Sequence, residues 1–144
     1  MALEILATAC AGLFAGAAIY VSVAEHPARL ECGGAVAVRE FAPSYRRAAI
    51  MQASLAVLGL LAAVGAWWRV GHAGLLVGGL LLGAVVPFTL LFIAPTNKRL
   101  LEPTLDPESA EAAALLRRWG RLHAVRSVLG TLAFGTLVVC LAQT

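Results

Sequence analysis

The chain has 144 residues, of which 60% are hydrophobic and 13% are charged, and it carries a formal net charge of +3. This composition is too apolar for a soluble domain and predicts an integral membrane protein. The basic residues lie beside apolar runs rather than on a folded basic surface, so the charge indicates membrane topology and not nucleic-acid binding.

Four apolar runs are each long enough to cross about 30 Å of hydrocarbon, which requires roughly 20 residues. They lie at about residues 3–24, 47–68, 73–94 and 122–142. Because they account for most of the chain, we expect residues 1–144 to form a single domain, an all-α antiparallel bundle of four transmembrane helices. The segment before the first run lacks the positive charge of a signal peptide, so this run is expected to remain as a spanning helix.

The first connection follows Pro27, which discourages continuation of the first helix. Residues 27–44 mix charged and apolar side chains, a pattern that suits a short helix lying in the membrane interface. Pro43 and Ser44 then offer an N-cap for the second spanning helix.

The remaining connections differ in length. The Gly71-His72-Ala73-Gly74 sequence predicts a tight turn, so helices two and three should form an antiparallel hairpin with His72 solvated in the turn. Pro87 should kink helix three. The second long connection contains an amphipathic segment at residues 108–118. We expect this segment to form a helix that lies at the interface and continues into span four.

Positive charge is concentrated in the two long connections, and on the other side of the spans only Arg69 is basic. The positive-inside rule therefore places both connections in the cytoplasm and both termini outside, in the inner (cytoplasmic) membrane. The basic residues of the connections are Arg29, Arg39, Arg46, Arg47, Lys98, Arg99, Arg117, Arg118 and Arg121, with Arg126 just inside span four.

A polar stripe enters span four. Trp119, His123 and Arg126 are spaced at i, i+4 and i+7, so they share one helix face. Since the helices alternate in direction, the polar ends of the other three spans arrive at the same membrane level. Their polar residues are Glu25, His26, Tyr45, Gln52, Thr96 and Asn97. This convergence predicts a pocket at the cytoplasmic face, open to lipid for an apolar ligand.

Ordinary contacts with lipid headgroups compete with this interpretation. We accept them for Arg29, Arg46, Arg47, Arg117 and Arg118. His123 and Asn97 are less typical anchors, so we favour a binding site for them. A metal held by His26, His123 and Glu25 is a further possibility, but no HxxH or ExxH spacing supports it. Adjacent Glu25 and His26 should also point about 100° apart on a regular helix, so we favour a site without metal or other cofactor.

Two minor features concern packing. Cys10, Cys32 and Cys140 are odd in number and lack metal spacing, which favours buried thiols over a Cys10–Cys140 disulfide. Gly12 and Gly16 form a GxxxG pair that permits close helix packing, either within the bundle or in a homo-oligomer through the glycine faces.

Four stretches of the chain resemble the anthrone oxygenase-like family, small four-helix membrane proteins whose bacterial members were long classed as a domain of unknown function. They are residues 16–30 (GAAIYVSVAEHPARL), 41–54 (FAPSYRRAAIMQAS), 95–100 (PTNKRL) and 118–129 (RWGRLHAVRSVL). The Pro-x-Asn stretch and the Trp-x3-His-x2-Arg pattern carry the resemblance most specifically.

The resemblance implies an oxidoreductase activity, because some fungal relatives oxidise an anthrone to an anthraquinone without flavin or haem. His123 would act as the base, with His26 as the alternative base or as the acid that protonates a peroxide. Asn97, Trp119 or Arg126 would bind the phenolate-like oxygen, and dioxygen would be the second substrate. Tyr45, Gln52 and Glu25 would complete the substrate site.

Two functions thus remain in competition. In the first, the protein binds a hydrophobic aromatic or quinone-like molecule at its cytoplasmic face and oxygenates it. In the second, it is a non-catalytic membrane carrier, subunit or assembly protein, whose polar cluster holds the helices together. A desolvated His123 would favour the enzyme, whereas a His123 facing headgroups would favour the alternative.

Overall fold

The computed structural model describes residues 1–143, which form four long helical segments and no strand, as the sequence predicts. The first segment runs through α1 (Ala2–Tyr20), the π-helical turn η1 (Val21–Glu25) and α2 (His26–Glu31). The second is α3 (Gly34–Val70). The third comprises α4 (Ala73–Gly83), α5 (Val85–Phe88), the π-helical turn η2 (Thr89–Ile93) and α6 (Ala94–Leu100), and the fourth is α7 (Ala110–Leu141).

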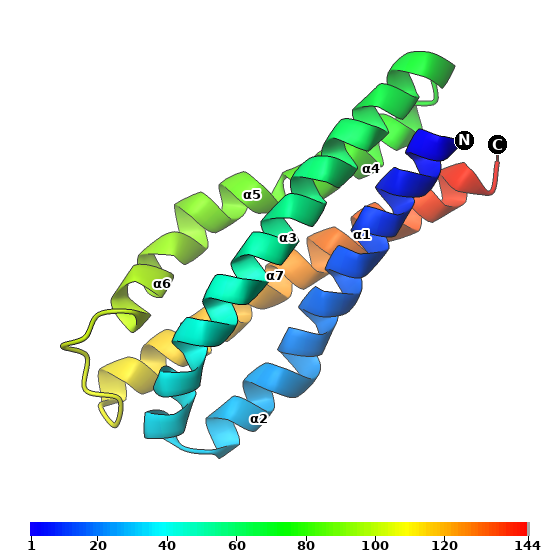
Figure 1. Ribbon diagram of the computed structural model, residues 1–144. Coiled ribbons are helices and arrows are strands. Elements are labelled where there is room, and N and C mark those ends of the chain that lie inside the picture. Colours follow the sequence, from blue (N-terminus) through cyan, green and yellow to red (C-terminus); the bar gives the residue numbers. More distant parts are fainter. Residues whose placement is uncertain (144) are drawn as a thin grey trace.

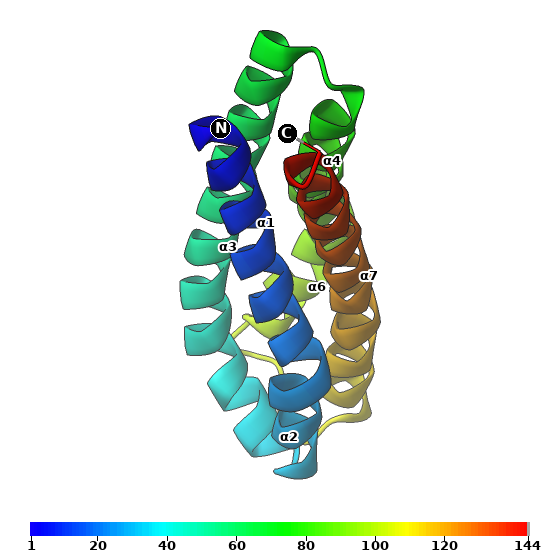
Figure 2. The same cartoon turned by 90° about the vertical axis from the view of Figure 1, so that its right-hand side faces the viewer.

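All four segments are long and apolar enough to cross a membrane, which suggests a multi-pass membrane protein. They pack side by side, with α1 against α3 and α7, and α4 against the same two helices. Both termini and the turn after α3 lie at one end of the molecule, whereas α2, α6 and the beginnings of α3 and α7 lie at the other (Figures 1 and 2). We call this second end the polar end.

The first connection is helical as expected, but its helix is continuous with the second span, so a separate short helix and an N-cap at Pro43–Ser44 are wrong predictions. The chain reverses at Gly33, which has a φ of +86°, a conformation that glycine adopts readily, and α3 begins at Gly34. Pro43 lies inside α3 on an exposed face, where the loss of one backbone hydrogen bond is tolerated. In the second connection α7 begins at Ala110 and continues into the fourth span, as predicted. Its N-cap is Ser109, whose side chain accepts a hydrogen bond from the backbone N–H of Ala112.

Pro27 does not end its helix, contrary to expectation. Proline lacks an N–H and its ring crowds the carbonyl four residues earlier, so a widened turn before it relieves both problems. Pro27 is the second residue after η1, and Pro95 is the second residue after η2. Near Pro87 the regular helix is interrupted at Ala84, between α4 and α5.

The turn between α3 and α4 is as tight as predicted. Gly71 has a φ of +71° and closes α3, and the exposed His72 caps α4 by accepting a hydrogen bond from the N–H of Gly74. Among the cysteines, which are all free, Cys10 and Cys140 are buried as expected. Cys32 is exposed, because it lies in the turn between α2 and α3 rather than inside a span.

Small residues allow the helices to approach closely in the half of the molecule that holds the termini. Most buried residues of this core are alanines, with Phe14, Leu75, Leu82 and Leu137 as the larger members. Gly59 lies where α3 meets α1 and α4, and Gly78 lies against Leu137 of α7. Such small-residue contacts are typical of membrane helices, which gain little from the hydrophobic effect when they associate. The two glycines of the GxxxG pair differ in their surroundings: a Cβ atom at Gly12 would lie 2.9 Å from the ring of Phe134, whereas a Cβ atom at Gly16 would have no neighbour within 4 Å.

The close contact at Gly59 generates a first prediction. A Cβ atom there would lie 2.4 Å from Cδ2 of Leu82 and 3.0 Å from Cβ of Cys10. Gly59→Ala is therefore expected to lower the free energy of unfolding by about 1–3 kcal/mol, although alanine favours helix. Thermal unfolding in detergent micelles measures the effect. The matched control, Gly16→Ala, should leave stability unchanged or raise it by up to about 1 kcal/mol, and equal losses in both variants would contradict the assigned packing.

Candidate functional site

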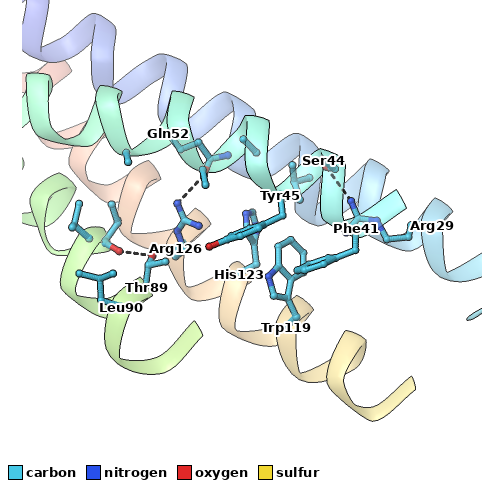
Figure 3. Close-up of a pocket in the computed structure, with 16 residues that line it drawn as sticks. Arg29, Phe41, Ser44, Tyr45, Gln52, Thr89, Leu90, Trp119, His123 and Arg126 are labelled. Atoms are coloured by element: carbon cyan, nitrogen blue, oxygen red, sulfur yellow. Dashed lines mark hydrogen bonds between the residues drawn. The ribbon is translucent and has the colours of Figure 1, made fainter. Parts of the chain in front are cut away.

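A pocket of about 190 Å³ lies between α3, the α5–η2 region and α7, in the half of the molecule toward the polar end (Figure 3). Most of its lining is apolar, and the alanines of α3 leave the space open. The lining residues are Val21, Arg29, Phe41, Ser44, Tyr45, Ala48, Ala49, Gln52, Ala53, Val85, Val86, Thr89, Leu90, Trp119, His123 and Arg126. An apolar cavity of about 150 Å³ holds a benzene ring, so this pocket is large enough for one aromatic ring.

Aromatic rings form one wall of the pocket. Phe41 and Tyr45 are four residues apart on α3 and their rings stack with centroids 5.7 Å apart, and Trp119 and His123 repeat this spacing on α7 at 4.7 Å. Phe41 meets Trp119 edge to face at 5.3 Å, which joins the two pairs. A continuous wall of rings suits a flat aromatic molecule.

Arg126 brings a positive charge to the pocket. Its Nη2 donates a hydrogen bond of 2.8 Å to Oε1 of Gln52, which supplies the partner expected for a buried amide, and its guanidinium lies 5.5 Å from the ring centre of Phe14. No carboxylate forms an ion pair with Arg126 among residues 1–143, and its Nε is buried without a partner. A guanidinium in this setting favours a ligand that carries negative charge.

His123 is the most enclosed titratable side chain of the stripe, with 3% of its surface exposed. Its Nδ1 lies 3.1 Å from Oγ of Ser22, which itself lies 2.8 Å from Oγ of Ser127. Ser22 belongs to η1, so the π-helical turn positions a hydroxyl beside the imidazole. π-helical turns are often found at functional sites, and η2 likewise supplies Thr89 and Leu90 to the pocket.

Of the eight predicted site residues, five line the pocket: Tyr45, Gln52, Trp119, His123 and Arg126. The other three, His26, Asn97 and Glu25, lie outside the lining. His26 packs behind the wall, with its ring 5.1 Å from that of Trp119, and a side chain at position 120 would collide with its Nε2. Glu25 accepts hydrogen bonds of 2.5 Å from Arg29 and Ser44.

Asn97 lies on α6, where it is fully buried and its amide nitrogen and oxygen have no hydrogen-bond partner in the part of the chain that the structure describes. Other enclosed atoms toward the polar end share this property: His26 Nδ1, Thr96 Oγ1, Trp119 Nε1 and Arg126 Nε. Buried polar groups are normally paired, so these atoms are available to hydrogen-bond water or a ligand.

Arg29 is not a headgroup anchor, contrary to expectation. Its side chain is buried and forms ion pairs with Glu25 and Glu40. The guanidinium also lies 5.7 Å from the ring centre of Phe41 and 5.6 Å from that of Trp119. It thereby joins α2, α3 and the aromatic wall, an arrangement that the neighbouring charges in the sequence do not reveal.

Several site residues escaped the sequence analysis. The sequence spacing could have identified Phe41, because it precedes Tyr45 by four residues and so shares a helix face with it, as Trp119 does with His123. Ser22, Ser44 and Ser127 lack a nucleophile motif and carry no signal of their own, since their role depends on contacts between distant helices. Thr89 and Leu90 reach the pocket from η2, and the sequence pattern does not predict this π-helical turn.

Metal ligation finds no geometric support in this region. Within residues 1–143, no group of three or more His, Cys, Asp or Glu side chains is arranged to hold a metal ion. The rings of His26 and His123 both contact the ring of Trp119, and Glu25 forms an ion pair with Arg29.

Comparison with known proteins bears directly on this site. A family model described as anthrone oxygenase matches residues 41–136, more than half of the chain. The chain belongs to the anthrone oxygenase family. A relative, the anthrone oxygenase tpcL of Aspergillus fumigatus, is 48% identical over 48 residues, which are 31% of this chain and 30% of the relative. No solved structure shows significant similarity to the chain.

Membership of the anthrone oxygenase family suggests an oxygenase-like role. The matched range contains the aromatic wall and the polar stripe, from Phe41 to Arg126. The α1–η1–α2 segment, which supplies Ser22 and Arg29, lies outside that range.

The buried Arg29 network generates a second prediction. Arg29→Met keeps the side-chain length but leaves Glu25 and Glu40 without their cation, so the free energy of unfolding should fall by about 2 kcal/mol. This is less than the loss of roughly 3–5 kcal/mol typical of a fully buried pair, because both carboxylates are partly exposed. Denaturation in micelles measures it, with the exposed Arg46→Met as the control. Equal stability of the two variants would contradict a structural role for Arg29.

Proposed function

We propose that this protein is a multi-pass membrane oxygenase that binds a hydrophobic aromatic molecule of the anthrone type and oxidises it with dioxygen, without a metal or organic cofactor. The observation that carries the proposal is the pairing of His123 and Arg126 on one face of α7 beside a wall of aromatic rings. A base and a cation are thus held next to a surface that fits a flat ring system.

The position of the pocket mouth supports entry of the substrate from the lipid. Ala53 and Leu90 line the pocket and are exposed. Along the helix axes Ala53 lies about 9 Å beyond Arg47, and Leu90 lies about 12 Å before Lys98, at 1.5 Å per residue. No charged residue follows Arg47 on α3 before Arg69, so the mouth opens onto apolar surface that would face hydrocarbon.

The proposed reaction begins at the methylene group of the anthrone, which lies across the central ring from the carbonyl group and is acidic for that reason. His123 removes one methylene proton, and the resulting negative charge gathers on the carbonyl oxygen, where Arg126 stabilises it. The electron-rich carbon forms a bond with dioxygen, and the protonated His123 returns its proton to the peroxide. Loss of the second methylene proton with cleavage of the O–O bond gives the ketone and water. One anthrone and one dioxygen yield one anthraquinone and one water.

The non-catalytic alternative assigns the polar cluster a structural role as part of a carrier, subunit or assembly protein. Burial of His123 favours the enzyme, because a histidine with 3% exposure is shielded from headgroups and from bulk water. The absence of a carboxylate partner for Arg126 among residues 1–143 also favours the enzyme, since a purely structural cation would be expected to have such a partner.

The membrane orientation follows from charge. The basic residues of the two polar-end connections would lie in the cytoplasm, with both termini outside, in the inner membrane. The site would then lie toward the cytoplasmic leaflet. A homo-oligomer through the glycine faces is compatible with the open surface at Gly16.

The third prediction concerns oxygen uptake by the purified protein with anthrone as substrate. His123→Ala should lower the rate about 10²- to 10⁴-fold, because it removes the base. Asn97→Ala should lower it less, since the amide lies outside the pocket lining. His72→Ala, the same change in the exposed turn at the other end of the molecule, should keep the parent rate.

Uptake by His123→Ala and Asn97→Ala at the parent rate would show that the site is wrongly assigned. Ligand binding without uptake would favour the non-catalytic carrier. Chelator treatment is expected to leave the rate unchanged, and iron, copper or zinc in stoichiometric amount in the active preparation would contradict the cofactor-free reaction.

A further inference from the structure

A chain of hydroxyl groups connects His123 to the backbone of α1. The Nδ1 of His123 lies 3.1 Å from the Oγ of Ser22, and this Oγ lies 2.8 Å from the Oγ of Ser127. The Ser127 hydroxyl in turn lies within hydrogen-bond distance of two carbonyl oxygens, that of Ala18 at 3.0 Å and that of His123 at 3.2 Å, and it has one hydrogen to donate to them. The chain therefore ends on groups that only accept hydrogen bonds.

The direction of the hydrogen bonds follows from the inventory of donors. A serine hydroxyl has one hydrogen, and a carbonyl oxygen has none. Serines inside helices commonly give this hydrogen to the carbonyl four residues earlier, and Ser127 has the His123 carbonyl in that position. With its hydrogen on a carbonyl, Ser127 accepts from Ser22. Ser22 has then used its hydrogen and accepts from the Nδ1–H of His123.

We propose that Ser22 and Ser127 are positioning residues that hold His123 in the tautomer with its proton on Nδ1. The other ring nitrogen, Nε2, then has a free lone pair and no partner among the described residues, in a side chain that lines the pocket. A neutral imidazole in this state is ready to accept a proton from a substrate. The inference rests on the proposed function, because it explains how the assigned base is prepared for its task.

The fold explains why this contact needs η1. Ser22 and His123 are 101 residues apart in the sequence and meet where the first segment packs against α7. Ser22 lies within the π-helical turn that precedes Pro27, so the turn that accommodates the proline also supplies the hydroxyl. These two serines belong to no catalytic motif, and their role comes from the imidazole that they orient.

The fourth prediction tests this arrangement by two measurements. The ¹⁵N chemical shifts of protein labelled on histidine, with the His123 signals assigned by their loss in His123→Ala, should show Nδ1 protonated and Nε2 unprotonated. In Ser22→Ala the Nε2–H form should appear, and kcat for anthrone oxidation should fall about 10- to 100-fold with little change in KM. Ser22→Thr keeps a hydroxyl and should recover most of the lost rate.

The control is Ser54→Ala, which removes a hydroxyl that bonds the Ile50 carbonyl on an exposed face of α3 and should leave both readouts unchanged. Thermal unfolding of Ser22→Ala checks that the variant folds, and Ser127→Ala should reproduce its tautomer shift. An Nε2–H tautomer in the parent protein, or an unchanged kcat in Ser22→Ala, would overturn the inference. If the parent protein shows the Nδ1–H tautomer but no oxygen uptake with anthrone, the proposed function would be overturned, whereas the positioning of His123 would remain supported.

Discussion

A guanidinium group without a carboxylate partner lies beside the apolar pocket, and the site is organised around it. Arg126 is held by the Gln52 side chain and by the face of Phe14, both of which are neutral. Burying a charge without an opposite charge is costly, so this guanidinium is suited to a ligand that carries negative charge. By contrast Arg29, which also lines the pocket, forms ion pairs with Glu25 and Glu40. The two arginines thus differ in their partners, and of the two only Arg126 has a guanidinium without an acidic partner among residues 1–143.

The two halves of the molecule differ in composition, and the site lies in the half toward the polar end. Alanines and glycines pack the half that holds the termini, whereas larger aromatic and polar side chains gather toward the polar end. Both π-helical turns, η1 and η2, lie at the level of the pocket and aim residues into or beside it. The same turns accommodate Pro27 and Pro95, so the local geometry that proline requires also shapes the site.

The sequence predicts the spans, the tight turn at Gly71 and the stripe of Trp119, His123 and Arg126, because these depend on hydropathy and on helix periodicity. It also predicts that the polar residues of different helices gather at one end, since antiparallel helices impose this. It does not predict that α3 starts at Gly34 and contains Pro43, or that Arg29 is buried, because both depend on tertiary contacts. The hydroxyl chain through Ser22 is likewise not predictable from the sequence, since this residue of η1 meets α7 only in the folded protein.

The most direct test of the central claim is equilibrium binding of two probes to the parent protein and to Arg126→Met in micelles: 2-hydroxyanthraquinone, at a pH where its phenol is ionised, and unsubstituted anthraquinone. The first probe carries negative charge on an aromatic oxygen, as the proposed anthrone anion does, and the second is neutral. We expect Arg126→Met to weaken binding of the ionised probe by about 10-fold or more, the loss of one charge-assisted hydrogen bond, and to affect the neutral probe far less. Arg46→Met, outside the pocket, should bind both probes like the parent. Equal affinity of the parent and Arg126→Met for the ionised probe would contradict the claim that the pocket binds a negatively charged aromatic oxygen through Arg126.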